Sequence, residues 1–84
     1  MYFVYVLQSA ADKKLYVGYA LNLEQRIQAH NQGNVASTKN RKPLKLIFYE
    51  SYTNKGDVLR REKYLKTTAG KRALKFMLKN TLCS

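Results

Sequence analysis

A carboxylate, Glu62, is predicted to face the interior of the protein. It falls in an expected helix that starts after Thr53 or Asn54 and runs to about Lys66. A projection at about 100° per residue places Val58 and Leu65 within about 20° of each other, and Glu62 falls at about 40°, inside this apolar stripe. Buried glutamate is rare unless it is paired or ligates a metal. Glu62 is therefore either a metal ligand or the partner of one of the many lysines and arginines.

The first expected helix, residues 23–32, carries a histidine and an arginine in a similar position. Leu23 and Ile27 define its inward face, His30 falls on that face, and Arg26 lies at its edge. A lone histidine on an apolar face is more often a hydrogen-bonded core residue than a catalyst. The neighbouring arginine favours function, because two cationic groups gain nothing from burial together unless an anion such as phosphate binds.

Tyrosine is the third unusual feature, with seven in 84 residues. If the first hairpin turns near Ala10–Ala11, Tyr5 and Tyr16 are direct cross-strand neighbours. Gly18 lies on the same face as Tyr16, and a strand glycine leaves room for a group to approach the backbone. An aromatic cross-strand pair alone is a packing feature worth about 0.2–1 kcal/mol. Beside a histidine, an arginine and a glutamate, the pair indicates a site.

The elements that must position these residues follow the order ββαβαα. The β-branched and aromatic first segment predicts a strand buried on both faces. Asn22 suits the N-cap of the first helix, and Gly33 its end. The expected strands are Tyr2–Gln8, Lys14–Ala20 and Leu44–Tyr52, and the expected helices are Leu23–Gln32, the segment ending near Lys66, and a last segment from Thr67 or Thr68 to about Thr81.

The last expected helix has an apolar stripe and a basic back. The stripe predicts core positions at Ala73, Leu74, Met77 and Leu78, and the outward side chains are Lys71, Arg72, Lys75 and Lys79. The fold class is therefore α/β in the α+β sense. It is a small three-stranded antiparallel sheet flanked by three helices, in one domain over residues 1–84.

Composition favours a polyanionic partner and excludes several classes of protein. The chain has 16 Lys+Arg against 5 Asp+Glu, a net charge of +11, and is 45% hydrophobic, too apolar for a disordered basic tail. No apolar run approaches the ~18–20 residues of a membrane span, and a signal-peptide pattern is absent. A single cysteine, Cys83, excludes a disulfide framework. We expect a cytoplasmic protein that binds nucleic acid and does not bind a membrane.

The scarcity of acids limits the possible catalytic chemistry. A two-metal nuclease needs several converging carboxylates, and a two-histidine ribonuclease needs a second histidine besides His30. An enzyme for small phosphate esters would need a glycine-rich phosphate loop, whereas the four glycines are isolated, so no small-molecule cofactor is expected. Any catalysis uses at most one metal. The acids are Asp12, Glu24, Glu50, Asp57 and Glu62.

Four segments over roughly residues 2–66 resemble the GIY-YIG nuclease family, especially its small stand-alone bacterial members. They are Phe3-Val4-Tyr5, Tyr16-Val17-Gly18, Asn22-Leu23-x-x-Arg26-x-x-x-His30-Asn31 and Leu59-Arg60-Arg61-Glu62. The chain departs from the family at Phe3, where the first tripeptide has glycine. Some members also use an asparagine of the last helix, for which Asn80 is the only candidate.

The resemblance implies a metal-dependent endonuclease that hydrolyses phosphodiester bonds of DNA. It implies Tyr5 and Tyr16 as active-site tyrosines, Arg26 as the phosphate-stabilising residue, His30 in proton transfer or orientation, and Glu62 as the ligand of one Mg²⁺ or Mn²⁺. The water nucleophile would give its proton to Tyr5 or Tyr16, or to His30 through a tyrosine. A tyrosine, with an ordinary pKa near 10, could do so at neutral pH only beside positive charge.

The substrate is less closely defined. We expect structure-selective or weakly specific cutting in DNA repair or processing, in the bacterial cytoplasm at the nucleoid. RNA is a possible substrate, and a protein partner or a homodimer could add specificity. The alternative is a catalytically silent module that binds DNA or RNA through its basic faces. The expected backbone-contacting surface is the segment with Lys39, Arg41, Lys42 and Lys45.

Overall fold

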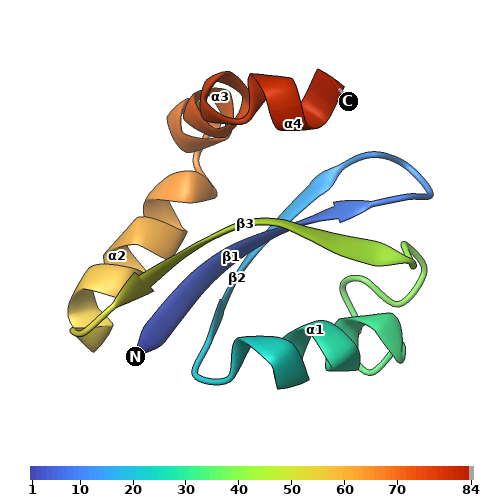
Figure 1. Ribbon diagram of the computed structural model, residues 1–84, viewed down its shortest axis with the longest axis horizontal. Helices are drawn as coiled ribbons and strands as arrows, with labels where there is room; N and C mark the ends of the chain where they lie inside the picture. The colour runs from blue at the N-terminus through green and yellow to red at the C-terminus, as the bar shows by residue number, and fades with distance from the viewer. Residues whose placement is uncertain (84) are drawn as a thin grey trace.

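A three-stranded antiparallel sheet forms the centre of the protein (Figure 1), and the computed structural model describes residues 1–83. The fold class and the order of elements are those expected, except that the last helix is divided into two. Asn22, Asn54 and Thr67 cap α1, α2 and α3 through their side chains. The elements are β1 (Tyr2–Ser9), β2 (Leu15–Ala20), α1 (Leu23–Asn31), β3 (Leu44–Tyr52), α2 (Lys55–Leu65), α3 (Thr68–Met77) and α4 (Lys79–Cys83).

Strand β1 is central, in the order β2-β1-β3, and is antiparallel to both neighbours. Tyr5 pairs with Gly18, and Tyr16 pairs with Leu7. The prediction that Tyr5 and Tyr16 are direct neighbours is therefore wrong. The hairpin turn is centred later than residues 10 and 11, so the two tyrosines are diagonal neighbours on the same face of the sheet.

Both faces of β1 are buried, as its composition predicts. Val4 and Val6 lie in a core cluster with residues of α2 and α3, including Leu65 and Leu74. Tyr5 lies on the opposite face, in a second cluster to which Leu23 and Ile27 of α1 contribute, together with Leu7, Ala20 and Leu44. The sheet thus separates α1 from the other helices (Figure 1). The predicted histidine and tyrosines belong to the α1 side.

Helix α3 ends before the predicted position. Leu78 follows it with φ −107° and ψ 22°, outside helical geometry, and the short α4 begins at residue 79. This break leaves Met77 46% exposed, whereas Leu74 and Leu78 are buried. The prediction of Met77 as a core residue is therefore wrong, because the buried side of this segment is formed by Leu74 and Leu78 and Met77 lies beside it. Within residues 1–83, no helix has the length and apolar character to cross a membrane.

Candidate active site

A buried chain of hydrogen bonds links β1, α1 and the segment after α1. The hydroxyl of Tyr5 lies 2.8 Å from Nε2 of His30, and Nδ1 of His30 lies 2.7 Å from Oγ1 of Thr38. All three residues are completely buried. The Thr38 hydroxyl donates to the carbonyl of Val35 at 3.5 Å, so its oxygen is left to accept from Nδ1–H. In this tautomer Nε2 accepts the Tyr5 proton.

The inward position of His30 follows from the helix that carries it. Leu23 and Ile27 pack against the sheet, and His30 is one turn beyond Ile27 on the same face. Helix α1 ends directly after the site, with Gly33 at φ +80°, a conformation that glycine adopts without steric cost. Asn31 ties this end to β3, because its side chain bonds both the N–H and the C=O of Leu44.

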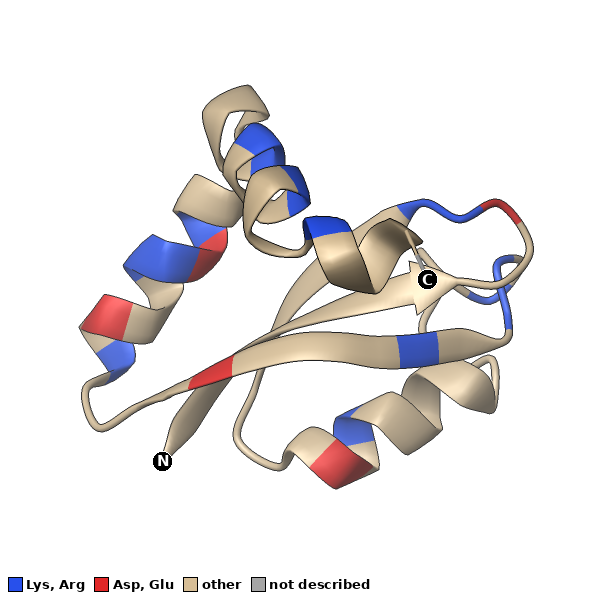
Figure 2. Cartoon of the chain, turned by 45° about the horizontal axis from the view of Figure 1, so that its top comes forward, with Lys and Arg blue, Asp and Glu red and all other residues tan. Residues whose placement is uncertain are grey.

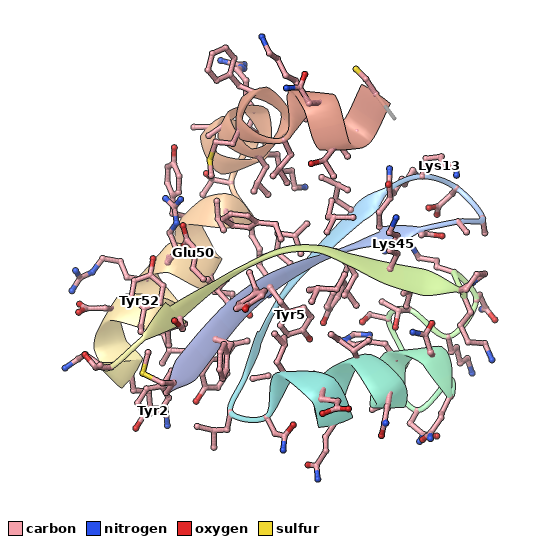
Figure 3. The ribbon with its side chains drawn as sticks, viewed as in Figure 1. Tyr2, Tyr5, Lys13, Lys45, Glu50 and Tyr52 are labelled. Carbon is pink, nitrogen blue, oxygen red and sulfur yellow. The ribbon has the colours of Figure 1, made fainter. Side chains whose placement is uncertain are left out.

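Gly18 provides the space for the Tyr5 ring. Tyr5 and Gly18 are directly opposite each other, and a Cβ atom at position 18 would overlap the Tyr5 hydroxyl and Cζ. The expectation that a group approaches the backbone here is therefore confirmed, and the group is Tyr5 itself. Figure 3 shows the labelled Tyr5 side chain on the α1 side of the sheet.

Arg26 lies at the open side of this cluster. Its Nε donates to the Tyr5 hydroxyl at 3.4 Å, yet the residue is exposed on α1. The pKa of Arg26 is raised, chiefly by the hydrogen bond with Tyr5, and its hydrogen bond with Tyr16 adds to this. A permanent cation thus contacts Tyr5, acts electrostatically on Tyr16 and also faces solvent. This placement suits an arginine that binds a phosphate arriving from solution.

Burial sets the protonation states of Tyr5 and His30. Burial raises the pKa of Tyr5, and this effect exceeds the lowering by Arg26. Burial also lowers the pKa of His30, with the nearby charge of Arg26 acting in the same direction. At neutral pH the tyrosine is therefore protonated and the imidazole is neutral. The positive charge of Arg26 alone does not outweigh the effect of burial on the pKa of Tyr5.

Tyr16 is the more accessible of the two tyrosines. It is half-buried on β2, whereas Tyr5 is completely buried. Its ring centroid lies 4.9 Å from that of His30 and 6.4 Å from that of Tyr5. The structure therefore brings Tyr5, Tyr16, Arg26 and His30 together, with Tyr16 and Arg26 at the solvent side.

Glu62 lies at the boundary of the protein and not deep inside it. Its side chain is 20% exposed, and Oε2 accepts a hydrogen bond from Nζ of Lys66 at 3.1 Å. This is the ion pair that the sequence left open as one alternative. The charge of Glu62 also contributes, as the smallest cause, to raising the pKa of Tyr5. Glu62 is thus electrostatically in reach of the cluster.

Glu50 is a second half-buried acid, with a different environment. Its two carboxylate oxygens accept from Nε and Nη2 of Arg61 at 2.9 and 3.2 Å, and Oε1 also accepts from the Tyr52 hydroxyl at 2.8 Å. Figure 3 shows Glu50 and Tyr52 on β3, beside α2. These contacts make Glu50 a structural link between β3 and α2.

The donor set of the site fits one hard cation that keeps most of its water. Within residues 1–83, no three His, Cys, Asp or Glu side chains cluster around a common point. A zinc or calcium cage made of protein ligands is therefore absent from that part of the chain. Mg²⁺ is commonly held by one or two carboxylates together with water and substrate phosphates. The lone Glu62 carboxylate meets that requirement.

The segment expected to contact the nucleic-acid backbone, residues 39–45, makes structural contacts through one of its basic residues. Arg41 pairs with Asp12 at 3.3 Å, and its backbone carbonyl accepts from the buried Ser9 hydroxyl at 2.6 Å. Lys39, Lys42 and Lys45 are exposed. Arg41 therefore helps to fasten this segment to the first hairpin, and the exposed lysines are the members that a ligand could reach.

Asn80 does not join the cluster. It is exposed on α4, and Leu82 of the same helix packs in the core on the α2–α3 side of the sheet. Tyr5 and His30 lie on the α1 side. The sheet thus separates Asn80 from the cluster of Tyr5, Tyr16, Arg26 and His30.

Two residues of the site were not found from the sequence. Thr38 lies in a polar loop and gave no periodic signal, although its type allows a hydrogen bond to a histidine. Lys66, one turn after Glu62, was visible as an i,i+4 pair. Such a pair is normally an exposed helix feature and does not by itself indicate a site.

Comparison with known proteins gives one family. The model of the GIY-YIG catalytic domain matches residues 1–75. A UPF0213 protein of Pediococcus acidilactici is 38% identical over 82 residues, covering 94% of this chain and 83% of its own. A UPF0213 protein of Clostridium perfringens is 45% identical over 67 residues, covering 79% and 71%. The solution NMR structure of a UPF0213 protein from Bacillus halodurans is similar with a TM-score of 0.58 and 27% identity, covering 92% of this chain and 85% of that one.

Proposed function

The chain belongs to the GIY-YIG nuclease family, and on this premise we propose that it is a metal-dependent endonuclease that hydrolyses phosphodiester bonds of DNA. The observation that carries the proposal is the cluster of Tyr5, Tyr16, Arg26 and His30, assembled from two strands and a helix. A purely structural cluster would not need a cation at its solvent side. Here Arg26 is exposed while it contacts the buried tyrosine.

Arg26 receives the phosphate in this proposal. Its Nε is occupied by the Tyr5 hydroxyl, so the planar guanidinium is held in one orientation while the residue remains exposed. A fixed cation stabilises the negative charge that builds on the phosphate during attack, at little cost in reorganisation. The buried hydrogen bonds from Tyr5 to His30 and from His30 to Thr38 stabilise this orientation, because they fix the position of the Tyr5 hydroxyl.

Tyr16, acting as the phenolate, accepts the proton of the attacking water and becomes the neutral phenol. Of the two tyrosines it is the one with access to solvent, and it lies beside the Arg26 cation. Tyr5 is completely buried, and its proton is directed to Nε2 of His30. Tyr5 and His30 are therefore positioning residues, and Tyr16 and Arg26 meet the substrate.

Glu62 would hold one divalent cation, Mg²⁺ or Mn²⁺, which when bound supplies positive charge for the leaving oxygen. Nζ of Lys66 now lies 3.1 Å from Oε2, and ligation of the cation through this oxygen would release the lysine. A lysine released in this way would be available to a phosphate. The proposed substrate is a DNA structure with little sequence preference, as met in repair or processing, and the proposed location is the bacterial cytoplasm at the nucleoid.

A cleavage assay with purified protein tests this function. Labelled DNA substrates that contain duplex, single-stranded and branched parts, and matched RNA substrates, are incubated with Mg²⁺, with Mn²⁺ or with EDTA. We expect metal-dependent products with 5′ or 3′ phosphate ends from DNA, and their loss in Arg26→Ala. Absence of cleavage on all substrates, with DNA binding retained, would instead establish the catalytically silent binding module.

A further inference from the structure

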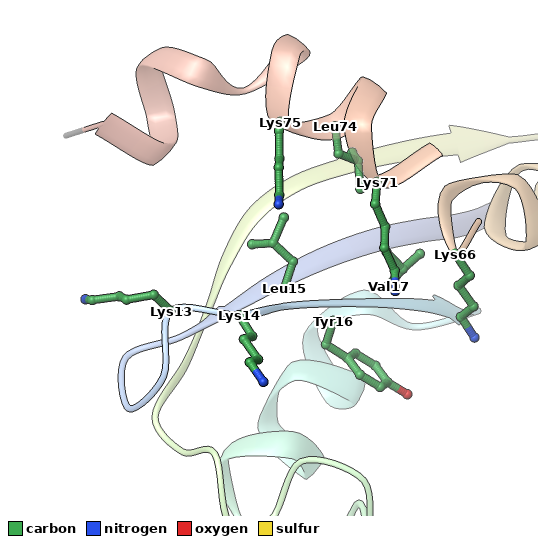
Figure 4. Close-up of a pocket in the computed structure, with 9 residues that line it drawn as sticks. All are labelled: Lys13, Lys14, Leu15, Tyr16, Val17, Lys66, Lys71, Leu74 and Lys75. Carbon is green, nitrogen blue, oxygen red and sulfur yellow. The ribbon is translucent and has the colours of Figure 1, made fainter. Parts of the chain in front are cut away.

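Five lysines line a groove along one edge of the sheet. The groove has a volume of about 580 Å³ and lies between the edge strand β2 and helix α3 (Figure 4). Its other side chains are Tyr16 and three apolar residues, of which Val17 and Leu74 are buried. The lysines are Lys13, Lys14, Lys66, Lys71 and Lys75.

The lysines come from three separate elements. Lys13 and Lys14 belong to the first hairpin turn, Lys66 follows α2, and Lys71 and Lys75 are one turn apart on α3. All five are exposed. Figure 2 shows that this side of the molecule, over α3 and the hairpin turn, carries more Lys and Arg than Asp and Glu. Figure 4 shows Lys71 and Lys75 pointing from α3 toward β2, whereas Lys14 and Tyr16 point to the other face of β2. The cations therefore extend across this edge of the sheet, an arrangement that fits a polyanion better than a single charge.

Two residues connect the groove with the catalytic cluster. Tyr16 lines the groove, and its ring lies 4.9 Å from that of His30 on the other side of β2. Lys66 also lines the groove and pairs with Glu62. Because β2 is an edge strand, a strand that passes from the groove over β2 reaches the residues proposed to cut it.

We propose that this groove binds the DNA strand on one side of the cleaved bond, with its phosphates at the five lysines. The inference rests on the proposed function for the identity of the polyanion. The partly exposed Leu15, which lies over the buried Val17 and Leu74, offers an apolar contact to the sugars and bases of the same strand, which a purely ionic ligand would not use. The groove, and not the segment with Lys39 and Lys45, is the main surface for the DNA backbone.

A pair of matched double variants tests the groove. Lys71→Ala/Lys75→Ala removes two exposed charges from it, and Lys39→Ala/Lys45→Ala removes two exposed charges from the other basic segment. Affinity for a fluorescein-labelled DNA hairpin with a single-stranded arm is measured by anisotropy in EDTA, at several salt concentrations. Thermal unfolding verifies that each variant is folded, and Lys71→Arg/Lys75→Arg provides the charge-conserving rescue.

The groove variant should lose about tenfold or more in affinity at 0.1 M salt. Its log–log salt slope should decrease by about 1.4–1.8, because each lost phosphate contact contributes about 0.7–0.9. The other double variant should change much less. Equal losses of affinity in the two double variants, or a larger loss in Lys39→Ala/Lys45→Ala, would overturn the proposal that the groove binds the DNA strand. Because binding is measured without metal, a wild-type protein that binds DNA but never cuts it refutes the nuclease function and leaves the test of the groove intact.

Discussion

The hydroxyl of Tyr5 and Nε2 of His30 lie 2.8 Å apart at a place where neither residue is exposed to solvent. Tyr5 belongs to the central strand and His30 to the last turn of α1, so this bond joins the sheet to the helix that covers it. Thr38 completes the chain at Nδ1. The neutral imidazole is therefore part of the fold as well as of the site, and its protonation must affect stability.

Replacement of His30 by Gln should reduce the dependence of stability on pH. The pKa of His30 in the folded protein is lowered by burial, whereas the unfolded chain has a value near 6.5. The unfolded state therefore binds more protons below about pH 6.5, and folding becomes weaker as the pH falls. The contribution of neutral His30 to stability is fully present above about pH 6.5, and it is lost as the pH falls from there toward the pKa of the folded protein. Over that range the free energy of unfolding should fall by up to about 1.4 kcal/mol per pH unit.

Urea denaturation between pH 7.5 and 5 measures this effect in the wild type and in His30→Gln. His30 is the only histidine, and every other group that titrates in this range is shared by both proteins. The free energy of unfolding should fall more steeply in the wild type. Parallel pH profiles would show that the imidazole is not held neutral in the folded protein.

Removal of the Thr38 hydroxyl should affect both stability and catalysis. Thr38→Val leaves Nδ1–H of the buried imidazole without an acceptor, which costs about 1–3 kcal/mol. It also frees the tautomer of His30, so the cleavage rate should fall and its pH profile should shift. Thr38→Ser retains the hydroxyl and should restore both properties. A Thr38→Val protein with normal stability and a normal pH profile of cleavage would show that the Thr38 hydroxyl does not position His30.

The sequence predicted the elements well because their signals are local. The caps at Asn22 and Asn54 and the doubly buried pattern of β1 depend on neighbours within a few residues. The predicted register of the first hairpin was wrong, because the register depends on the length of the turn. A turn of polar residues has no periodicity from which its centre could be located. The break at Leu78 was missed for a similar reason, since no glycine or proline marks it.

The site was predictable where polar side chains interrupt an apolar pattern. His30 and Glu62 were found in this way, and Arg26 by its position beside His30. The partners were not predictable, because Thr38 and Lys66 have ordinary surroundings in the sequence and become significant only through their distances to His30 and Glu62. The groove was missed because its lysines come from three elements that only the fold brings together.

Replacement of each tyrosine by phenylalanine should have different effects on cleavage and on stability. Tyr16→Phe removes the accessible hydroxyl, and cleavage should fall by about 10²–10⁴-fold, the usual contribution of a general base, with little change in stability. Tyr5→Phe removes the buried hydroxyl that bonds His30 and Arg26, so the free energy of unfolding should fall by about 1–3 kcal/mol in addition to a loss of rate. Single-turnover cleavage and urea denaturation measure the two effects. If Tyr16→Phe cuts DNA at the normal rate while Tyr5→Phe does not, the proton passes through Tyr5 to His30.

The two half-buried glutamates should give opposite results when each is replaced by alanine. Glu62 has one hydrogen bond, to an i,i+4 lysine, which is worth about 0.3–0.5 kcal/mol, so Glu62→Ala should be nearly as stable as the wild type. It should nevertheless lose metal-dependent cleavage, because no group of three His, Cys, Asp or Glu side chains among residues 1–83 offers the cation another site. DNA affinity should be retained, since it depends mainly on lysine–phosphate contacts.

Glu50 is the matched control for this prediction. It is exposed to a similar extent, 26% against 20%, but it accepts two hydrogen bonds from Arg61 and one from Tyr52. Glu50→Ala should therefore lower the free energy of unfolding by about 1–3 kcal/mol and leave Tyr52 and Arg61 without their shared partner. At a temperature where it is folded, its cleavage rate should be normal. Retained cleavage in Glu62→Ala, or loss in Glu50→Ala alone, would move the cation from α2 to β3.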